Sequence, residues 1–187
     1  MDFVSYLDVF EKILNNPQPP APYDNPDYFN YAKLNWSRMH RWLKQATIAP
    51  ETKSVVMAIT QPQNWIVITE PWCGDAAHIV PFFELLSALN PMIKVDYQLR
   101  DSPPFLINEY LTNGGKSIPK LIIRNSDGKD LGTWGPRPAE CQELYNQLVA
   151  EKADFETLKT ELQKWYNKDQ GKLIQAELTQ LLATTQQ

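Results

Sequence analysis

Apolar residues near the start of the chain recur at the spacing of an amphipathic helix, at positions 3, 6, 7, 10, 13 and 14. A proline-rich connector, NNPQPPAPYDNP, ends this pattern. Within it, Asn25 followed by Pro26 is typical of a helix start, because an asparagine side chain caps free N–H groups and proline fits the first helical position. The pattern therefore predicts a second helix to about Gln45, and the run PETKSVVMAIT predicts a short third helix.

The middle of the chain alternates short β-branched runs with helical segments. Four runs predict strands: NWIVIT, IKVDYQL, PKLIIRN and KDLGTW. A helix from about Cys73 to Leu89 separates the first two runs, and a short helix over PFLINEYL precedes the third. A turn at Ser126–Lys129 joins the last two. Helical crossovers favour parallel pairing and a tight turn makes an antiparallel pair, so we expect an α/β fold with a mixed four-stranded sheet flanked by helices.

The C-terminal part adds more helix than such a sheet needs. The segment GPRPAE begins a long predicted helix that ends at Gly171, and one further helix follows. Its apolar residues keep a seven-residue rhythm that Glu151 interrupts, namely Leu148, Phe155, Leu158, Leu162 and Trp165. We expect these turns to pack on the N-terminal helices of the same chain, and the alternative is the seam of a weak dimer. One domain over residues 1–187 is expected, with helical extensions at 1–61 and 151–187 around a core at 62–150.

The composition is that of an ordinary globular protein, with 187 residues of which 43% are hydrophobic. A net charge of −4 argues against nucleic acid or an anionic membrane as partner. No run of about eighteen apolar residues predicts a membrane-spanning helix, and the acidic start does not fit a signal peptide, so we expect a cytoplasmic protein. Two cysteines and two histidines without zinc spacing predict no disulfide framework, no metal site and no bound cofactor.

The stretch TEPWCGDAAHIVPFF holds the strongest candidate for chemistry. Cys73 follows a predicted strand at the start of a helix, where free N–H groups and the helix dipole favour the reactive thiolate. Glu70 and Asp75 flank the cysteine and oppose a second negative charge, whereas Lys120 and Arg137 would restore positive potential if the fold brings them close. These opposing effects leave the direction of the net pKa shift open.

Four features around this cysteine occur in a characteristic order. They are Trp72-Cys73-Gly74 after a buried strand, Pro81 within the following helix, Ile118-Pro119 before the third strand, and Gly135 after the hairpin. Together they resemble the thioredoxin family over roughly residues 62–150, and the combination of WCGD with a later WGPRP resembles a bacterial subgroup with helical additions at both ends. The resemblance implies a thioredoxin-like fold, a cis-proline at Pro119 and a glycine, Gly135, that faces the active site.

Two positions depart from the family pattern. Ala76 stands where the resemblance implies a second, resolving cysteine, and Val67 stands where it implies a buried aspartate that relays protons to that cysteine. Both losses remove the internal second step of a dithiol reaction. A mixed disulfide on Cys73 would then be released by a low-molecular-weight thiol or by Cys141, although a lone cysteine in a helix is more typically a small buried hydrophobe.

Two functions follow from the resemblance. The first is a monothiol oxidoreductase, in which Cys73 is the nucleophile for thiol–disulfide exchange with a disulfide-containing protein. The second is a non-catalytic module that holds an extended peptide by strand-like hydrogen bonds, with Cys73 idle or a redox sensor. The residues expected to bind the partner in either case are Trp72, Gly74, Asp75, Ile118, Pro119, Gly135 and Arg137.

Two side chains near this site are interpreted from their local sequence. Arg137 lies between two prolines that fix its backbone, so it is the best candidate for binding an anion such as a substrate carboxylate. His78 is five residues after Cys73 and points away from the cysteine's side of the helix, so we expect it at the surface or partly packed.

Overall fold

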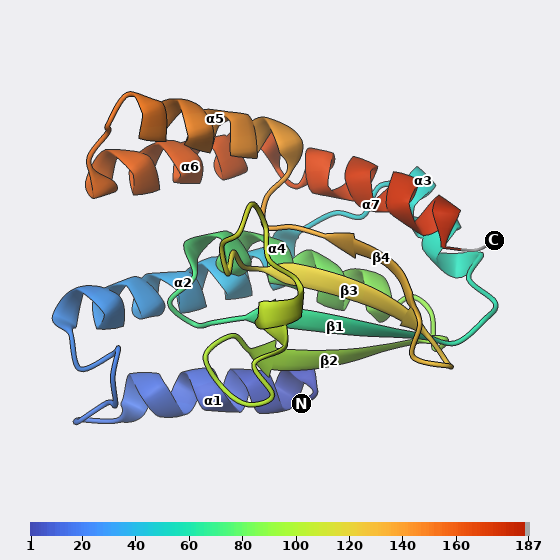
Figure 1. The fold of residues 1–187 in the computed structure, drawn as a ribbon, viewed down its shortest axis with the longest axis horizontal. Coiled ribbons are helices and arrows are strands. Elements are labelled where there is room, and N and C mark those ends of the chain that lie inside the picture. The colour runs from blue at the N-terminus through green and yellow to red at the C-terminus, as the bar shows by residue number, and fades with distance from the viewer. Residues whose placement is uncertain (186–187) are drawn as a thin grey trace.

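A four-stranded sheet lies at the centre of the computed structural model, which describes residues 1–185 (Figure 1). The strands are β1 (Gln63–Thr69), β2 (Ile93–Leu99), β3 (Lys120–Asn125) and β4 (Asp130–Trp134). The helices are α1 (Phe3–Asn15), α2 (Pro26–Gln45), α3 (Pro50–Met57), α4 (Gly74–Ser87), α5 (Ala139–Ala150), α6 (Phe155–Asp169) and α7 (Lys172–Thr184), with one 3-10 turn, η1 (Leu106–Glu109). The expected α/β fold is confirmed.

The sheet is mixed, as predicted, and its strand order is β2-β1-β3-β4. β1 pairs parallel with β2, starting from Gln63 opposite Ile93, because helix α4 carries the chain back across the sheet. β3 runs antiparallel to both β1 and β4. β1 is therefore an inner strand, and Trp65, Val67 and Ile68 on it are at most 1% exposed. The end of this buried strand is the fixed point from which the candidate site is built.

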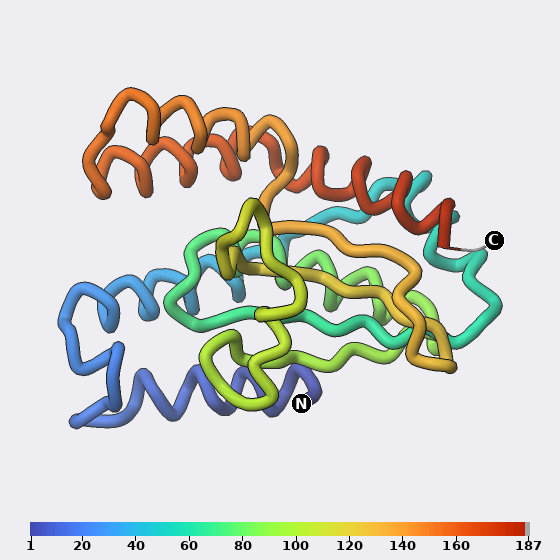
Figure 2. The backbone as a smooth tube through the Cα atoms, in the orientation of Figure 1, coloured from blue at the N-terminus to red at the C-terminus, as the bar shows by residue number. Residues whose placement is uncertain are grey.

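The helical extensions pack on the sheet domain and on each other. α1 contacts β2 and α2, and α2 packs along α4 (Figure 1). α5 and α6 run side by side as a pair, and α7 packs against α3, as the backbone trace in Figure 2 shows. The side chain of Gln175 on α7 accepts the N–H of Ala49 at 2.7 Å, and Thr179 contacts Thr52 at 2.9 Å. The C-terminal helix thus packs on an N-terminal helix of the same chain.

The prediction of one long helix after GPRPAE is wrong, because the chain folds back between α5 and α6. α5 ends at Ala150, and Asp154 then caps α6 by accepting the N–H of Thr157 at 2.7 Å. The predicted end at Gly171 is confirmed. Its φ of +74° suits glycine, and a Cβ there would lie 2.0 Å from the ring of Phe82. The apolar rhythm across residues 148–165 therefore belongs to two helices that face each other.

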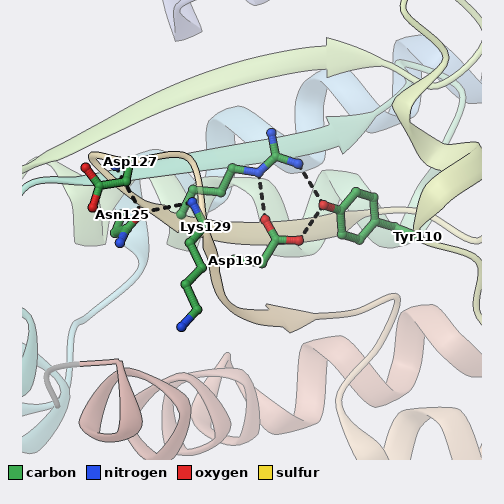
Figure 3. A network of polar contacts seen from close by, with 6 residues as sticks. Tyr110, Asn125, Asp127, Lys129 and Asp130 are labelled. Carbon is green, nitrogen blue, oxygen red and sulfur yellow. Dashed lines mark hydrogen bonds and ion pairs between the residues drawn. The ribbon is translucent and has the colours of Figure 1, made fainter.

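The helix predicted over PFLINEYL is reduced to the single turn η1, which a polar network ties to the sheet edge (Figure 3). Arg124 on β3 donates to Asp130 on β4 and to the hydroxyl of Tyr110, each at 2.7 Å, and that hydroxyl donates to Asp130. The side chain of Asn125 accepts two backbone N–H groups of the β3–β4 turn. This network anchors the segment just before the loop that carries Ile118.

Within the part of the chain that the structure describes, no helix has the length and apolar character needed to span a membrane.

Candidate functional site

Cys73 is the N-cap residue of α4, immediately after the turn that follows β1. Its Sγ accepts the N–H of Ala76 at 3.4 Å, and its S–H donates to the carbonyl oxygen of Ile118, also at 3.4 Å. The predicted helix start near Cys73 is confirmed, and the sulfur joins this helix start to the loop before β3. Because the thiol both accepts and donates a hydrogen bond, this geometry fits the protonated form.

Cys73 is only 6% exposed, and helix α2 lies over the start of α4 next to it. A Cβ placed on Gly74 would lie 2.2 Å from the hydroxyl oxygen of Tyr31, which shows how closely the tyrosine lies over the start of α4. The fully buried Asn35, one turn further along α2, donates to the carbonyl of Pro71 at 3.0 Å. Helix α2, which was expected to belong to an N-terminal extension outside the core, therefore forms one wall of the site.

The environment of Cys73 raises the pKa of its thiol to about 12. Burial is the main cause, since it disfavours the charged thiolate, and the negative charge of Asp75 adds to it. The N–H of Ala76 and the positive charge of Arg137 act in the opposite direction but do not offset burial. The direction of the pKa shift, which the sequence left open, is therefore upward and favours the protonated thiol.

Asp75 and Arg137 form a buried ion pair beside Cys73. The guanidinium Nη2 lies 2.6 Å from the Asp75 carboxylate, and the hydroxyl of Tyr166 on α6 donates to the other carboxylate oxygen at 2.7 Å. Arg137 also donates to Gln142 at 3.1 Å, and its guanidinium lies 4.1 Å from the ring centre of Tyr145. The anion that Arg137 contacts in the structure is therefore Asp75. Tyr166, 91 residues from Asp75, was missed because no local pattern links the two.

His78 is 3% exposed, so its expected position at the surface or only partly packed is wrong. Its Nδ1 accepts the indole N–H of Trp42 at 2.8 Å, which leaves Nε2 to carry the proton and donate to Gln163 at 3.0 Å. The ring also stacks on Tyr166 at 4.3 Å. Burial lowers the pKa of His78 to about 3, so the imidazole is neutral at physiological pH. These contacts join α2, α4 and α6, and none of them reaches the sulfur.

The Ile118–Pro119 peptide bond is cis, and Gly135 packs against it. A Cβ on Gly135, whose φ is +118°, would lie 2.2 Å from the carbonyl oxygen of Pro119. The ammonium of Lys120 donates to Thr112 at 2.8 Å and to the carbonyl of Gly135 at 3.4 Å. Burial lowers the pKa of Lys120. Lys120 therefore holds together the loop before β3 and the segment after β4, and its ammonium is directed to these partners.

Trp72 and Glu70 lie in the turn between β1 and α4, just before Cys73. The guanidinium of Arg100 lies 4.6 Å from the ring centre of Trp72, and the ring of Tyr28 meets the indole edge-on at 6.3 Å. The carboxylate of Glu70 is 7% exposed and accepts the N–H of Asp101 at 2.9 Å. Burial raises the pKa of Glu70 to about 7.

A cavity of about 960 Å³ opens beside the sulfur, between α2, the start of α4, the α5–α6 pair and the loop before β3. Six of the predicted site residues line it: Trp72, Cys73, Gly74, Asp75, Ile118 and Arg137. Pro119 and Gly135 do not line it, and they pack against each other. The structure therefore brings most of the predicted residues to one cavity, whose remaining walls come from the helical extensions.

Cys141 does not line this cavity and is fully buried in α5. Burial raises the pKa of its thiol to about 12. Residues 1–185 contain no group of three or more histidine, cysteine, aspartate or glutamate side chains placed to hold a metal ion.

A family model described as thioredoxin matches residues 23–165. The match begins before α2 and ends within α6, so it is wider than the 62–150 expected from the sequence motifs. Among solved structures, an HIV 4E10 epitope-scaffold is similar with a TM-score of 0.58 and 13% identity, covering 98% of each chain. A protein of unknown function from Pseudomonas aeruginosa has a TM-score of 0.52 and 15% identity, covering 91% of this chain and 98% of its own. No curated protein matches the sequence.

Proposed function

Because the chain belongs to the thioredoxin family, we propose that it is a binding module that holds an extended peptide segment beside Ile118, with Cys73 kept as a thiol. The peptide would pair with the loop before β3 as an added strand, and its side chains would enter the cavity next to the sulfur. The cavity, at about 960 Å³, is within the usual range for a ligand site. Tyr31, Trp72 and Tyr166 supply aromatic surface for apolar side chains.

The burial of Cys73 is the observation that carries this proposal. A pKa of about 12 leaves roughly one molecule in 100,000 as thiolate at neutral pH. Thiol–disulfide exchange begins with thiolate attack, so its rate falls with that fraction. Peptide binding has no such requirement.

Monothiol exchange is the second candidate, and the position of the sulfur favours it. Cys73 lines the cavity, and its Sγ accepts an N–H at the start of α4, a 14-residue helix whose dipole stabilises a thiolate. In this reaction the thiolate attacks one sulfur of a substrate disulfide, forms a mixed disulfide and releases the other sulfur as a thiolate. A low-molecular-weight thiol then attacks the mixed disulfide and frees Cys73.

The pH dependence of alkylation separates the two candidates. Iodoacetamide labelling of Cys73, read by peptide mass spectrometry between about pH 6 and pH 11, reports the thiol pKa. We expect slow labelling at neutral pH and an inflection well above the ordinary value of about 8.5. An inflection below that value would favour exchange. As a matched test without added reductant, Cys73→Ser keeps partner binding if the module proposal holds and loses it if partners are held by mixed disulfides.

A further inference from the structure

We infer that the cavity beside Cys73 selects a peptide segment that carries a carboxylate between apolar side chains. This inference rests on the proposed peptide-binding function and adds the chemical class of the ligand. Its evidence is the set of charged and exposed apolar side chains that α2, α6 and the loop before β3 place around the cavity.

The cavity is basic although the chain is acidic. Its basic lining residues are Arg38, Arg100, Lys116, Arg137 and Lys159, and its acidic ones are Asp27, Asp75 and Glu156. The whole chain, in contrast, has a net charge of −4. A positively charged cleft concentrates anionic ligands even when the molecule as a whole is negative.

Two of the three acidic lining residues are already paired. Both carboxylate oxygens of Asp75 are taken, one by Arg137 at 2.6 Å and one by the Tyr166 hydroxyl at 2.7 Å. Glu156 pairs with Lys159 at 2.6 Å. The negative charge of Asp75 is therefore balanced by Arg137, so it does not exclude a ligand carboxylate from the cavity.

Two of the lining cations have no carboxylate within ion-pair distance in residues 1–185. Arg38 on α2 donates to the neutral side chain of Asn35 at 3.0 Å, and its guanidinium lies 5.2 Å from the ring centre of Tyr31. Lys116 is exposed in the loop that leads to Ile118. Arg100, by contrast, pairs with Asp101. Arg38 and Lys116 thus remain as partners for a carboxylate that enters the cavity.

Large exposed apolar side chains surround the same cavity. Tyr28 and Leu34 on α2 are 45% and 47% exposed, and Phe155 on α6 is 68% exposed. Single exposed hydrophobic residues are ordinary, but three that line one cavity from two elements mark a binding surface. A ligand that matches both features has apolar side chains on either side of its charge.

Calorimetric titration with matched peptides tests the inference. The probes are acetylated heptapeptides with one Leu/Val frame and either glutamate, glutamine or lysine at the central position, all with an amidated C-terminus. A fourth probe has central glutamine and a free C-terminal carboxylate, which separates a side-chain carboxylate from a chain end. We expect the glutamate peptide to bind about two- to fivefold more tightly than the glutamine peptide, because a partly shielded ion pair is worth a factor of a few. The difference should shrink in about 0.5 M salt.

Variants of the two cations identify the site. Arg38→Gln and Lys116→Gln should each reduce the preference for glutamate, whereas Lys44→Gln, an exposed residue of the same α2 helix outside the cavity, should not. Lys116→Gln, in an exposed loop, decides if Arg38→Gln fails to fold. Equal affinity for the glutamate, glutamine and lysine peptides would overturn this inference and leave the proposed function standing. Failure of all four peptides to bind would overturn both.

Discussion

The position of Tyr31 over Gly74, next to Cys73, leads to the first prediction. In Tyr31→Ala the ring that lies over Gly74 is lost, and solvent reaches the sulfur. Burial is the largest cause of the raised thiol pKa, so this pKa should fall from about 12 toward the ordinary value of about 8.5. Each unit of that fall raises the thiolate fraction at neutral pH about tenfold. We expect Cys73 to be alkylated at least about ten times faster than in the wild type at neutral pH.

The assay follows iodoacetamide labelling of both cysteines by mass spectrometry under reducing conditions. Cys141, which is fully buried in α5, serves as an internal reference, because unfolding would expose both thiols together. Tyr28→Ala is the matched control, since this residue of the same helix contacts Trp72 edge-on rather than Gly74. Tyr31→Phe, which removes only the hydroxyl, should fall between the wild type and Tyr31→Ala.

A selective change at Cys73 is the required result. If Tyr31→Ala labels Cys73 at the wild-type rate while circular dichroism shows a folded protein, the tyrosine is not what keeps the thiol protonated. If Cys73 and Cys141 accelerate together, the variant has unfolded, and Tyr31→Phe then decides the question.

Three further predictions concern stability. Gly171→Ala should lower the free energy of unfolding by at least about 2 kcal/mol more than Gly128→Ala in urea titrations. Both glycines have positive φ, but of the two only Gly171 has a side chain where a Cβ would lie. Equal losses in the two variants would contradict the packing argument. Tyr166→Phe removes the hydroxyl bond to Asp75 and should cost about 2 kcal/mol in the same assay, and a loss near zero would show that this bond adds no stability. Glu70 has a folded-state pKa raised from 4.5 to about 7, so the folded state holds the proton between these values and stability falls as pH rises through them. Glu70→Gln should remove this loss, at most about 3 kcal/mol, and parallel stability profiles between about pH 4.5 and pH 7.5 would refute the assignment.

The strands, the parallel first pair and the antiparallel last pair could be predicted because their signals are local. Four β-branched runs, the crossover helix after Cys73 and the turn at Ser126–Lys129 indicate these pairs, whereas the pairing of β1 with β3 has no local signal. The break between α5 and α6 was missed because the apolar rhythm continues across it. Asp154 was the available signal, since an aspartate three residues before Thr157 is a usual helix cap.

The walls of the site could not be predicted because they depend on contacts between distant segments. Asn35 meets Pro71 across 36 residues, and Tyr166 meets Asp75 across 91. Nothing in the sequence near Cys73 indicates that an aromatic ring from α2 lies over Gly74. The sign of the pKa shift at the sulfur is a consequence of that packing, so it too was beyond local sequence patterns.

The hydrogen bonds of Cys73 determine what any chemistry there requires. Its S–H donates to the Ile118 carbonyl, so deprotonation would lose that bond and place an anion 3.4 Å from a carbonyl oxygen. Val67 and Ala76 are fully buried and apolar, so no titratable group stands at either position to take the proton. An extended peptide that pairs with the loop before β3 would compete for the Ile118 carbonyl and release the thiol from it. Loss of this bond alone does not make Cys73 reactive, because a bound peptide also buries the sulfur and burial is the main cause of its raised pKa.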